Sequence, residues 1–141
     1  MPQEKSCGFV VYRIEGEAPL YLILHYGEGH WDFAKGHIEI GESGIETAKR
    51  ELFEETGIEE IAPVPGFVEK IGYFFTHEGK KVHKEVFFFL GETNEKEVKL
   101  SDEHVEYEWL EYEKAIEKLT YVNAKNVLQK AHTRVLQVLS Q

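Results

Sequence analysis

Hydrophobic and polar residues alternate with the spacing of β-strands near the N-terminus. Residues 6–13 (SCGFVVYR) and 20–26 (LYLILHY) are rich in β-branched and aromatic side chains, and the polar segment 15–19 between them contains Gly and Pro. We predict two strands joined as a hairpin. A loop-rich segment follows at residues 27–41, with a short strand predicted at 31–33.

The segment that follows this loop has the period of a helix. Ser43 is followed three residues later by Glu46, which is the spacing of a capping box. Gly57 suits the left-handed conformation that ends a helix, so we predict a helix over residues 43–56. Three apolar residues at helical spacing would face the core: Ile45, Ala48 and Leu52.

The second half of the chain contains further strands and then helices. We predict three strands and two helices, over residues 67–75, 82–91, 106–110, 113–119 and 123–139. The first two of these strands flank the polar turn THEGKK. The order of elements predicts one α/β (α+β) domain over residues 1–141, with a mixed β-sheet sandwiched between α-helices.

Negative charge is concentrated around the first predicted helix. The chain carries 26 acidic and 16 basic residues, for a formal net charge of −10. Residues 39–60 hold eight glutamates against Lys49 and Arg50, so more than half of the excess lies in this segment. Because binding to a phosphate backbone requires clustered Lys and Arg, we expect no long nucleic acid as a partner.

The cysteine content and the length of the apolar runs indicate where in the cell the protein is expected to work. Cys7 is the only cysteine, which excludes an internal disulfide and a thiolate metal cluster. The N-terminus lacks the basic region and apolar run of a signal peptide. The longest apolar run, residues 86–90, is too short to span a bilayer. We expect a cytoplasmic protein with no membrane partner.

Glu51, Glu54 and Glu55 have helical spacing and therefore project from one face, one turn apart. Carboxylates held so close repel one another unless a cation lies among them. Oxygen ligands at this density suit Mg²⁺ or Mn²⁺ rather than zinc. The alternative is an acidic face that is simply solvated.

The residues around these glutamates have a recognisable spacing. Between Gly36 and Ile58 the sequence reads G-x5-E-x7-REL-x-EE-x-GI, which fills every fixed position of the Nudix box. The chain therefore resembles the Nudix hydrolases. The resemblance implies the Nudix fold and hydrolysis of a nucleoside diphosphate linked to another moiety, with Mg²⁺ as cofactor and Mn²⁺ as a possible substitute.

The resemblance also implies roles for residues of the box. Glu51, Glu54 and Glu55 match the metal-ligand glutamates of the family, and the backbone carbonyl of Gly36 is a usual further ligand. Arg50 matches the arginine that orients these carboxylates through ion pairs. In this chemistry, metal ions neutralise the phosphates, hold them in line and activate water.

Two flanking segments narrow the resemblance within the family. They resemble the matching segments of the asymmetric diadenosine tetraphosphate hydrolases, and they are residues 30–42 (HWDFAKGHIEIGE) and residues 100–110 (LSDEHVEYEWL). Ala34 departs from that pattern, which usually has proline before the lysine. Glu103 matches a glutamate outside the box that serves either as an extra metal ligand or as the general base.

The same resemblance implies five substrate contacts: Lys35, His37, Tyr73, Lys84 and Tyr121. The lysines would bind phosphate, and the tyrosines would stack on adenine or simply pack in the fold. His37 would donate to a phosphate or only cap its loop. Three neighbours rival Lys84 for the phosphate: Lys80, Lys81 and His83.

Three functions remain open from the sequence. The first is hydrolysis of diadenosine tetraphosphate to ATP and AMP by a monomer or weak dimer. The second is another Nudix pyrophosphohydrolase activity, on ADP-ribose, an RNA 5′-triphosphate or an oxidised nucleoside triphosphate. The third is a Nudix-fold binding module without catalysis, which is disfavoured because such modules usually lose box glutamates and all are present here.

Overall fold

A computed structural model describes residues 3–141 of the chain. Its strands form one sheet: β1 (Gln3–Glu15), β2 (Ala18–Tyr26), β3 (Trp31–Asp32), β4 (Ala34–His37), β5 (Ala62–Pro63), β6 (Glu69–His77), β7 (Lys80–Glu92) and β8 (His104–Leu110). Its helices are α1 (Gly44–Thr56), α2 (Tyr112–Lys118) and α3 (Val122–Leu139).

Strand β1 lies at the centre of the sheet and pairs with three neighbours. It runs antiparallel to β2 and β4 and parallel to β7. Strand β7 in turn pairs with β5 and β6, and β2 pairs with β3 and β8. The sheet is therefore mixed, as the sequence predicted.

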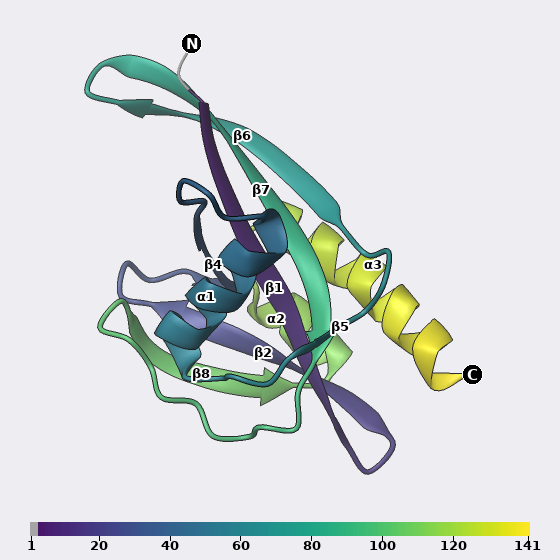
Figure 1. The fold of residues 1–141 in the computed structure, drawn as a ribbon. Coiled ribbons are helices and arrows are strands. Elements are labelled where there is room, and N and C mark those ends of the chain that lie inside the picture. The colour runs from purple at the N-terminus through teal and green to yellow at the C-terminus, as the bar shows by residue number, and fades with distance from the viewer. Residues whose placement is uncertain (1–2) are drawn as a thin grey trace.

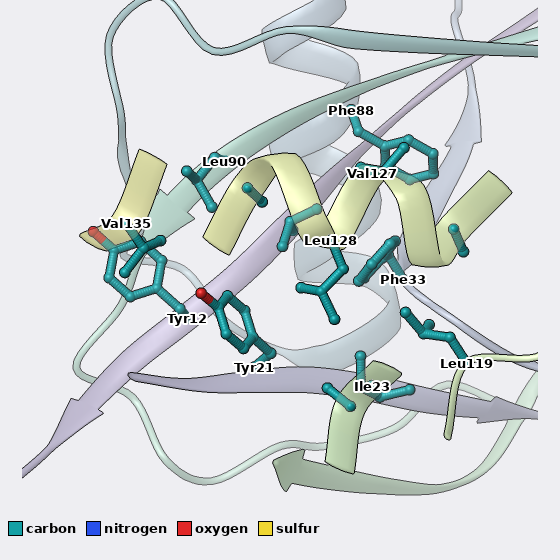
Figure 2. Close-up of a cluster of buried hydrophobic side chains, with 14 of the residues drawn as sticks. Tyr12, Tyr21, Ile23, Phe33, Phe88, Leu90, Leu119, Val127, Leu128 and Val135 are labelled. Atoms are coloured by element: carbon teal, nitrogen blue, oxygen red, sulfur yellow. The ribbon is translucent and has the colours of Figure 1, made fainter. Parts of the chain in front are cut away.

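Helices cover both faces of this sheet (Figure 1). Successive side chains of a strand point to opposite faces, and β1 supplies both cores. Phe9 and Val11 pack in the cluster that includes residues of α1. Val10 and Tyr12 pack in the cluster beneath α2 and α3, shown in Figure 2. The predicted fold, a mixed sheet sandwiched between helices, is confirmed.

Both ends of α1 are fixed by the local chemistry that the sequence indicated. The Ser43 hydroxyl accepts from the backbone N–H of Glu46, and the Glu46 carboxylate accepts from the backbone N–H of Ser43 at 2.8 Å. At the other end Gly57 has a φ of 77° and its N–H donates to the carbonyl of Phe53. These caps fix where α1 starts and stops, and so which glutamates share a face.

Strands β4 and β5 were not predicted from the sequence. The AKGH sequence of β4 lacks an alternation of apolar and polar residues, and the strand forms because it pairs with β1 at Phe9–Ala34 and Cys7–Gly36. This pairing holds Lys35 and Gly36 next to α1. No helix between residues 3 and 141 is long and apolar enough to cross a membrane.

Candidate active site

Arg50 is the centre of an ion-pair network on the outer face of α1. Its Nε donates to Glu42 at 2.6 Å, and its Nη1 donates to Glu51 at 2.8 Å and to Glu54 at 3.0 Å. Its Nη2 donates to the backbone carbonyl of His37 at 3.0 Å. The guanidinium therefore connects the end of β4 to the helix and holds three glutamates of the box.

Glu42 stabilises the loop that leads into α1. The hydrogen bond from Arg50 is the main reason that its pKa falls to about 2, and a hydrogen bond from the Thr47 hydroxyl adds to the effect. The same carboxylate accepts from the backbone N–H of Glu39 at 3.0 Å. Protein donors thus surround Glu42, which suits it to orienting the loop.

Glu51 lies directly against the backbone of Gly36. A Cβ atom added at Gly36 would overlap the Glu51 carboxylate, so only glycine leaves room for that side chain. The carboxylate is fixed from its other side by Arg50. Two predicted metal-ligand positions, one on β4 and one on α1, are therefore neighbours.

Glu55 is the buried member of the cluster, with 3% of its surface exposed. The Tyr26 hydroxyl donates to its Oε1 at 3.3 Å, while Nε2 of His104 lies 3.1 Å from Oε1 without the direction of a hydrogen bond. Its Oε2 has no hydrogen-bond partner within residues 3–141. Burial first, then Glu51 and the charge of Glu103, raises the pKa of Glu55 to about 9.

These residues fit a hard divalent cation. Glu55, Glu103 and His104 each offer a ligand atom, and these atoms lie within 4.8 Å of one another. The backbone N–H of Ser101 donates to the carbonyl of Glu55, which holds the loop that carries Glu103 against the end of α1. A buried, unpartnered carboxylate oxygen among other carboxylates is the environment that Mg²⁺ or Mn²⁺ stabilises.

A cavity of about 620 Å³ brings together four of the five predicted substrate contacts: Lys35, Tyr73, Lys84 and Tyr121. Burial raises the pKa of Tyr73, and it lowers that of Lys84 with a further contribution from the charge of Lys35. His37 does not line the cavity. It is exposed and its Nε2 lies 3.1 Å from the carboxylate of Glu4.

Lys35 connects this cavity to the glutamate cluster. Its Nζ lies 3.6 Å from the carboxylate of Asp32 and 5.4 Å from the ring centre of Tyr26. Since the hydroxyl of Tyr26 bonds to Glu55, one short chain of contacts leads from the cavity to the buried carboxylate.

Two residues of the cavity that contact Tyr26 or Lys35 were not predicted from the sequence. His30 and Asp32 line it, and the ring of His30 stacks on Tyr26 with centroids 4.5 Å apart. Burial is the main cause that lowers the pKa of His30. The short strand predicted at 31–33 included Asp32 but gave no signal for His30, which precedes it.

Comparisons with known proteins agree with this geometry. The NUDIX domain family model matches residues 3–131. The asymmetrical bis(5′-nucleosyl)-tetraphosphatase of Mus musculus is 32% identical over 140 residues, covering 91% of this chain and 92% of that protein. An RNA pyrophosphohydrolase of Bartonella bacilliformis is 31% identical over 113 residues, covering 67% of this chain and 66% of that protein.

Solved structures of other proteins are also similar to this one. The C. elegans Ap4A hydrolase in a binary complex superposes with a TM-score of 0.79 at 28% identity, covering 95% of this chain and 98% of that one. The dihydroneopterin triphosphate pyrophosphohydrolase of E. coli has a TM-score of 0.73 at 18% identity, covering 92% and 97% of the two chains, and shares the fold. With its box complete and the family model matching most of its length, the chain belongs to the Nudix hydrolase family.

Proposed function

We propose that this protein hydrolyses diadenosine tetraphosphate asymmetrically, to ATP and AMP, with Mg²⁺ as cofactor. The observation that carries the proposal is the cavity in which Tyr73 and Tyr121 lie with Lys35 and Lys84, linked to the buried Glu55 through Lys35 and Tyr26. Two aromatic side chains and two cations are the groups that a nucleotide with several phosphates requires. Whole-length similarity to asymmetrical bis(5′-nucleosyl)-tetraphosphatases supports the same substrate.

The metal would be held by residues of the box. The proposed ligands are the carbonyl of Gly36 and the carboxylates of Glu51, Glu54 and Glu55, which leaves Glu103 to act on the attacking water. When bound, Mg²⁺ neutralises phosphate charge and makes water bound to it more acidic. Arg50 keeps the carboxylates of Glu51 and Glu54 in one orientation by donating to both.

Glu103 is the better general base of the two catalytic carboxylates. Its side chain is exposed and so accessible to water, whereas the carboxylate of Glu55 is buried and would be occupied by the cation. A base must reach the attacking water with an oxygen that is not already engaged. We therefore assign proton acceptance to Glu103 and charge compensation to Glu55.

The cavity residues would bind the nucleotide. Lys35 and Lys84 donate to phosphate oxygens, and the rings of Tyr73 and Tyr121 stack on adenine, a contact worth about 1–3 kcal/mol per base. His37, exposed at the end of β4, would donate to phosphates that extend beyond the cavity. These contacts position the polyphosphate chain, which supplies much of the acceleration in phosphoryl transfer.

A second candidate is the removal of pyrophosphate from the 5′-triphosphate end of RNA. The similarity to the Bartonella RNA pyrophosphohydrolase favours it. The net charge of −10 opposes it, because a long polyanion would be repelled by most of the surface.

A substrate panel with Mg²⁺ tests the proposal. We expect the highest kcat/KM for diadenosine tetraphosphate, with ATP and AMP formed in equal amounts, compared with ADP-ribose, an oxidised nucleoside triphosphate and 5′-triphosphorylated RNA. Preference for any of the last three would overturn the specificity. Tight nucleotide binding without turnover of any substrate would instead identify a binding module.

A further inference from the structure

Two segments that are distant in the sequence line the same cavity. One is the turn after β2 with strand β3, which contributes His30 and Asp32, and the other is the start of α3, which contributes Tyr121. The ring centroids of His30 and Tyr121 lie 5.6 Å apart. The width of the cavity between these walls therefore depends on what joins the two segments.

Thr120 joins them through a reciprocal pair of hydrogen bonds with Trp31. The backbone N–H of Thr120 donates to the carbonyl of Trp31 at 3.2 Å. The backbone N–H of Trp31 donates to the Thr120 hydroxyl at 2.8 Å. A side-chain oxygen thus takes the place that a backbone carbonyl has in a sheet, so this junction depends on which residue stands at position 120.

The linker around Thr120 is short and anchored on one side. Helix α2 ends at Lys118 and α3 begins at Val122, so the linker consists of residues 119–121. Leu119 is 2% exposed and anchored in the core. Tyr121 follows Thr120 directly and caps α3 without a side-chain hydrogen bond, while 51% of its surface is exposed. Because its side chain makes no capping hydrogen bond, the place of its ring depends on the backbone on either side, which includes Thr120.

Trp31 is a firm anchor for this junction. The His25 ring stacks on its indole with centroids 4.4 Å apart and planes 3° apart. The Nζ of Lys118 lies 4.3 Å from the centre of the Trp31 ring and 3.0 Å from the carboxylate of Glu108. Protein groups already cover the indole, so Trp31 supports the cavity wall and is not a surface for a base.

We propose that Thr120 is a positioning residue that sets the place of Tyr121 and so the fit of the cavity to adenine. The inference rests on the proposed function in one respect, namely that Tyr121 contacts the base. Among residues 3–141, Thr120 does not line the cavity, and its two hydrogen bonds both go to Trp31. Its effect should therefore fall on substrate binding and not on the chemical step.

The first test is Thr120→Val, which keeps the shape of the side chain and removes the hydroxyl. We expect KM to rise about 2- to 10-fold, the range for one lost hydrogen bond, with kcat within about 2-fold of wild type. Thr120→Ser should restore the wild-type KM. Thr120→Ala also removes the hydroxyl but leaves a smaller side chain, so it repeats the test with a different side-chain shape. Thermal unfolding verifies that each variant is folded.

Thr133→Val is the matched control. Thr133 is an exposed threonine of α3 whose hydroxyl, within residues 3–141, bonds only to the Gln129 carbonyl of its own helix. The same chemical change there should leave KM unaltered. An unchanged KM in folded Thr120→Val would overturn the proposal, as would an equal rise in Thr133→Val.

A double-mutant cycle separates an effect through Tyr121 from a general one. In a Tyr121→Ala background, adding Thr120→Val should raise KM no further. If the rise persists there, Thr120 acts by another route and the proposal is wrong. The cycle uses whichever adenine nucleotide the wild type cleaves fastest, or the Kd for AMP if it cleaves none, so an error in the proposed substrate does not decide this result.

Discussion

Glu54 and Glu55 are adjacent in the sequence and have opposite surroundings. The Glu54 side chain is 52% exposed and pairs with Arg50 at 3.0 Å. Glu55 is buried, and no lysine or arginine of residues 3–141 lies within ion-pair distance of it. Because charge without a partner is costly in a buried position, Glu55 is the carboxylate of the cluster that gains most from a bound cation.

Replacing Glu55 with glutamine tests its catalytic role. We expect Glu55→Gln to lower kcat by about 100-fold or more, the scale for losing one electrostatic contact to the reacting groups. The fold should persist, because at neutral pH without metal Glu55 is already uncharged. Steady-state kinetics and thermal unfolding measure both effects. The exposed Glu59→Gln serves as control, and near-normal turnover by Glu55→Gln would contradict its assignment.

The pKa of Glu55 also predicts how stability depends on pH. Folding raises this pKa from its ordinary 4.5 to about 9, so between these values the folded protein binds a proton that the unfolded chain releases. The contribution to stability is complete below pH 4.5 and is lost as pH rises through 9. In EDTA the Tm should fall between pH 6 and pH 9 more for the wild type than for Glu55→Gln.

Added Mg²⁺ should reverse this loss, since the cation binds the ionised carboxylate and so stabilises the folded state. The stabilisation by Mg²⁺ should therefore grow with pH in the wild type and much less in Glu55→Gln. Parallel Tm curves for the two proteins in EDTA would show that another group controls the pH dependence.

At the scale of elements, the sequence specifies α1 better than β4. The signals for α1 are local, since Ser43 with Glu46 starts the helix and Gly57 ends it, and the observed helix matches the predicted one closely. Strand β4 has no such signal, because Lys35 and Gly36 adopt the strand only by pairing with β1. Yet the site needs both elements, with β4 placed against the helix.

Gly36→Ala tests the contact between these two elements. The added Cβ would displace the Glu51 carboxylate, so we expect the affinity for Mn²⁺ to fall about 10-fold or more, on the scale of damage to the groups that orient metal ligands. Calorimetric titration with Mn²⁺ measures it without substrate. In a Glu51→Ala background the same change should have little further effect; an undiminished effect there would place the damage elsewhere.

At the scale of the whole molecule, the cavity joins residues that the sequence keeps far apart. Lys35 comes from β4, Tyr73 from β6, Lys84 from β7 and Tyr121 from the start of α3. Resemblance to a family predicted these four positions, but the pairing of strands and the packing of α3 bring them together. His30 escaped prediction for this reason, since only the folded sheet brings its ring beside Tyr121.

The two tyrosines provide a test of the cavity as one binding site. Tyr121→Ala should raise KM for diadenosine tetraphosphate about 10-fold and leave kcat nearly unchanged, since loss of stacking on a base costs about 1–3 kcal/mol and Tyr121 is not among the groups that could hold the metal. Tyr73→Ala should act in the same direction.

If both rings contact one adenine, the double variant should lose less binding energy than the two single variants combined, because the base is already loosened by the first change. Simple additivity would indicate that they contact different parts of the substrate, and an unchanged KM in either single variant would remove that residue from the site.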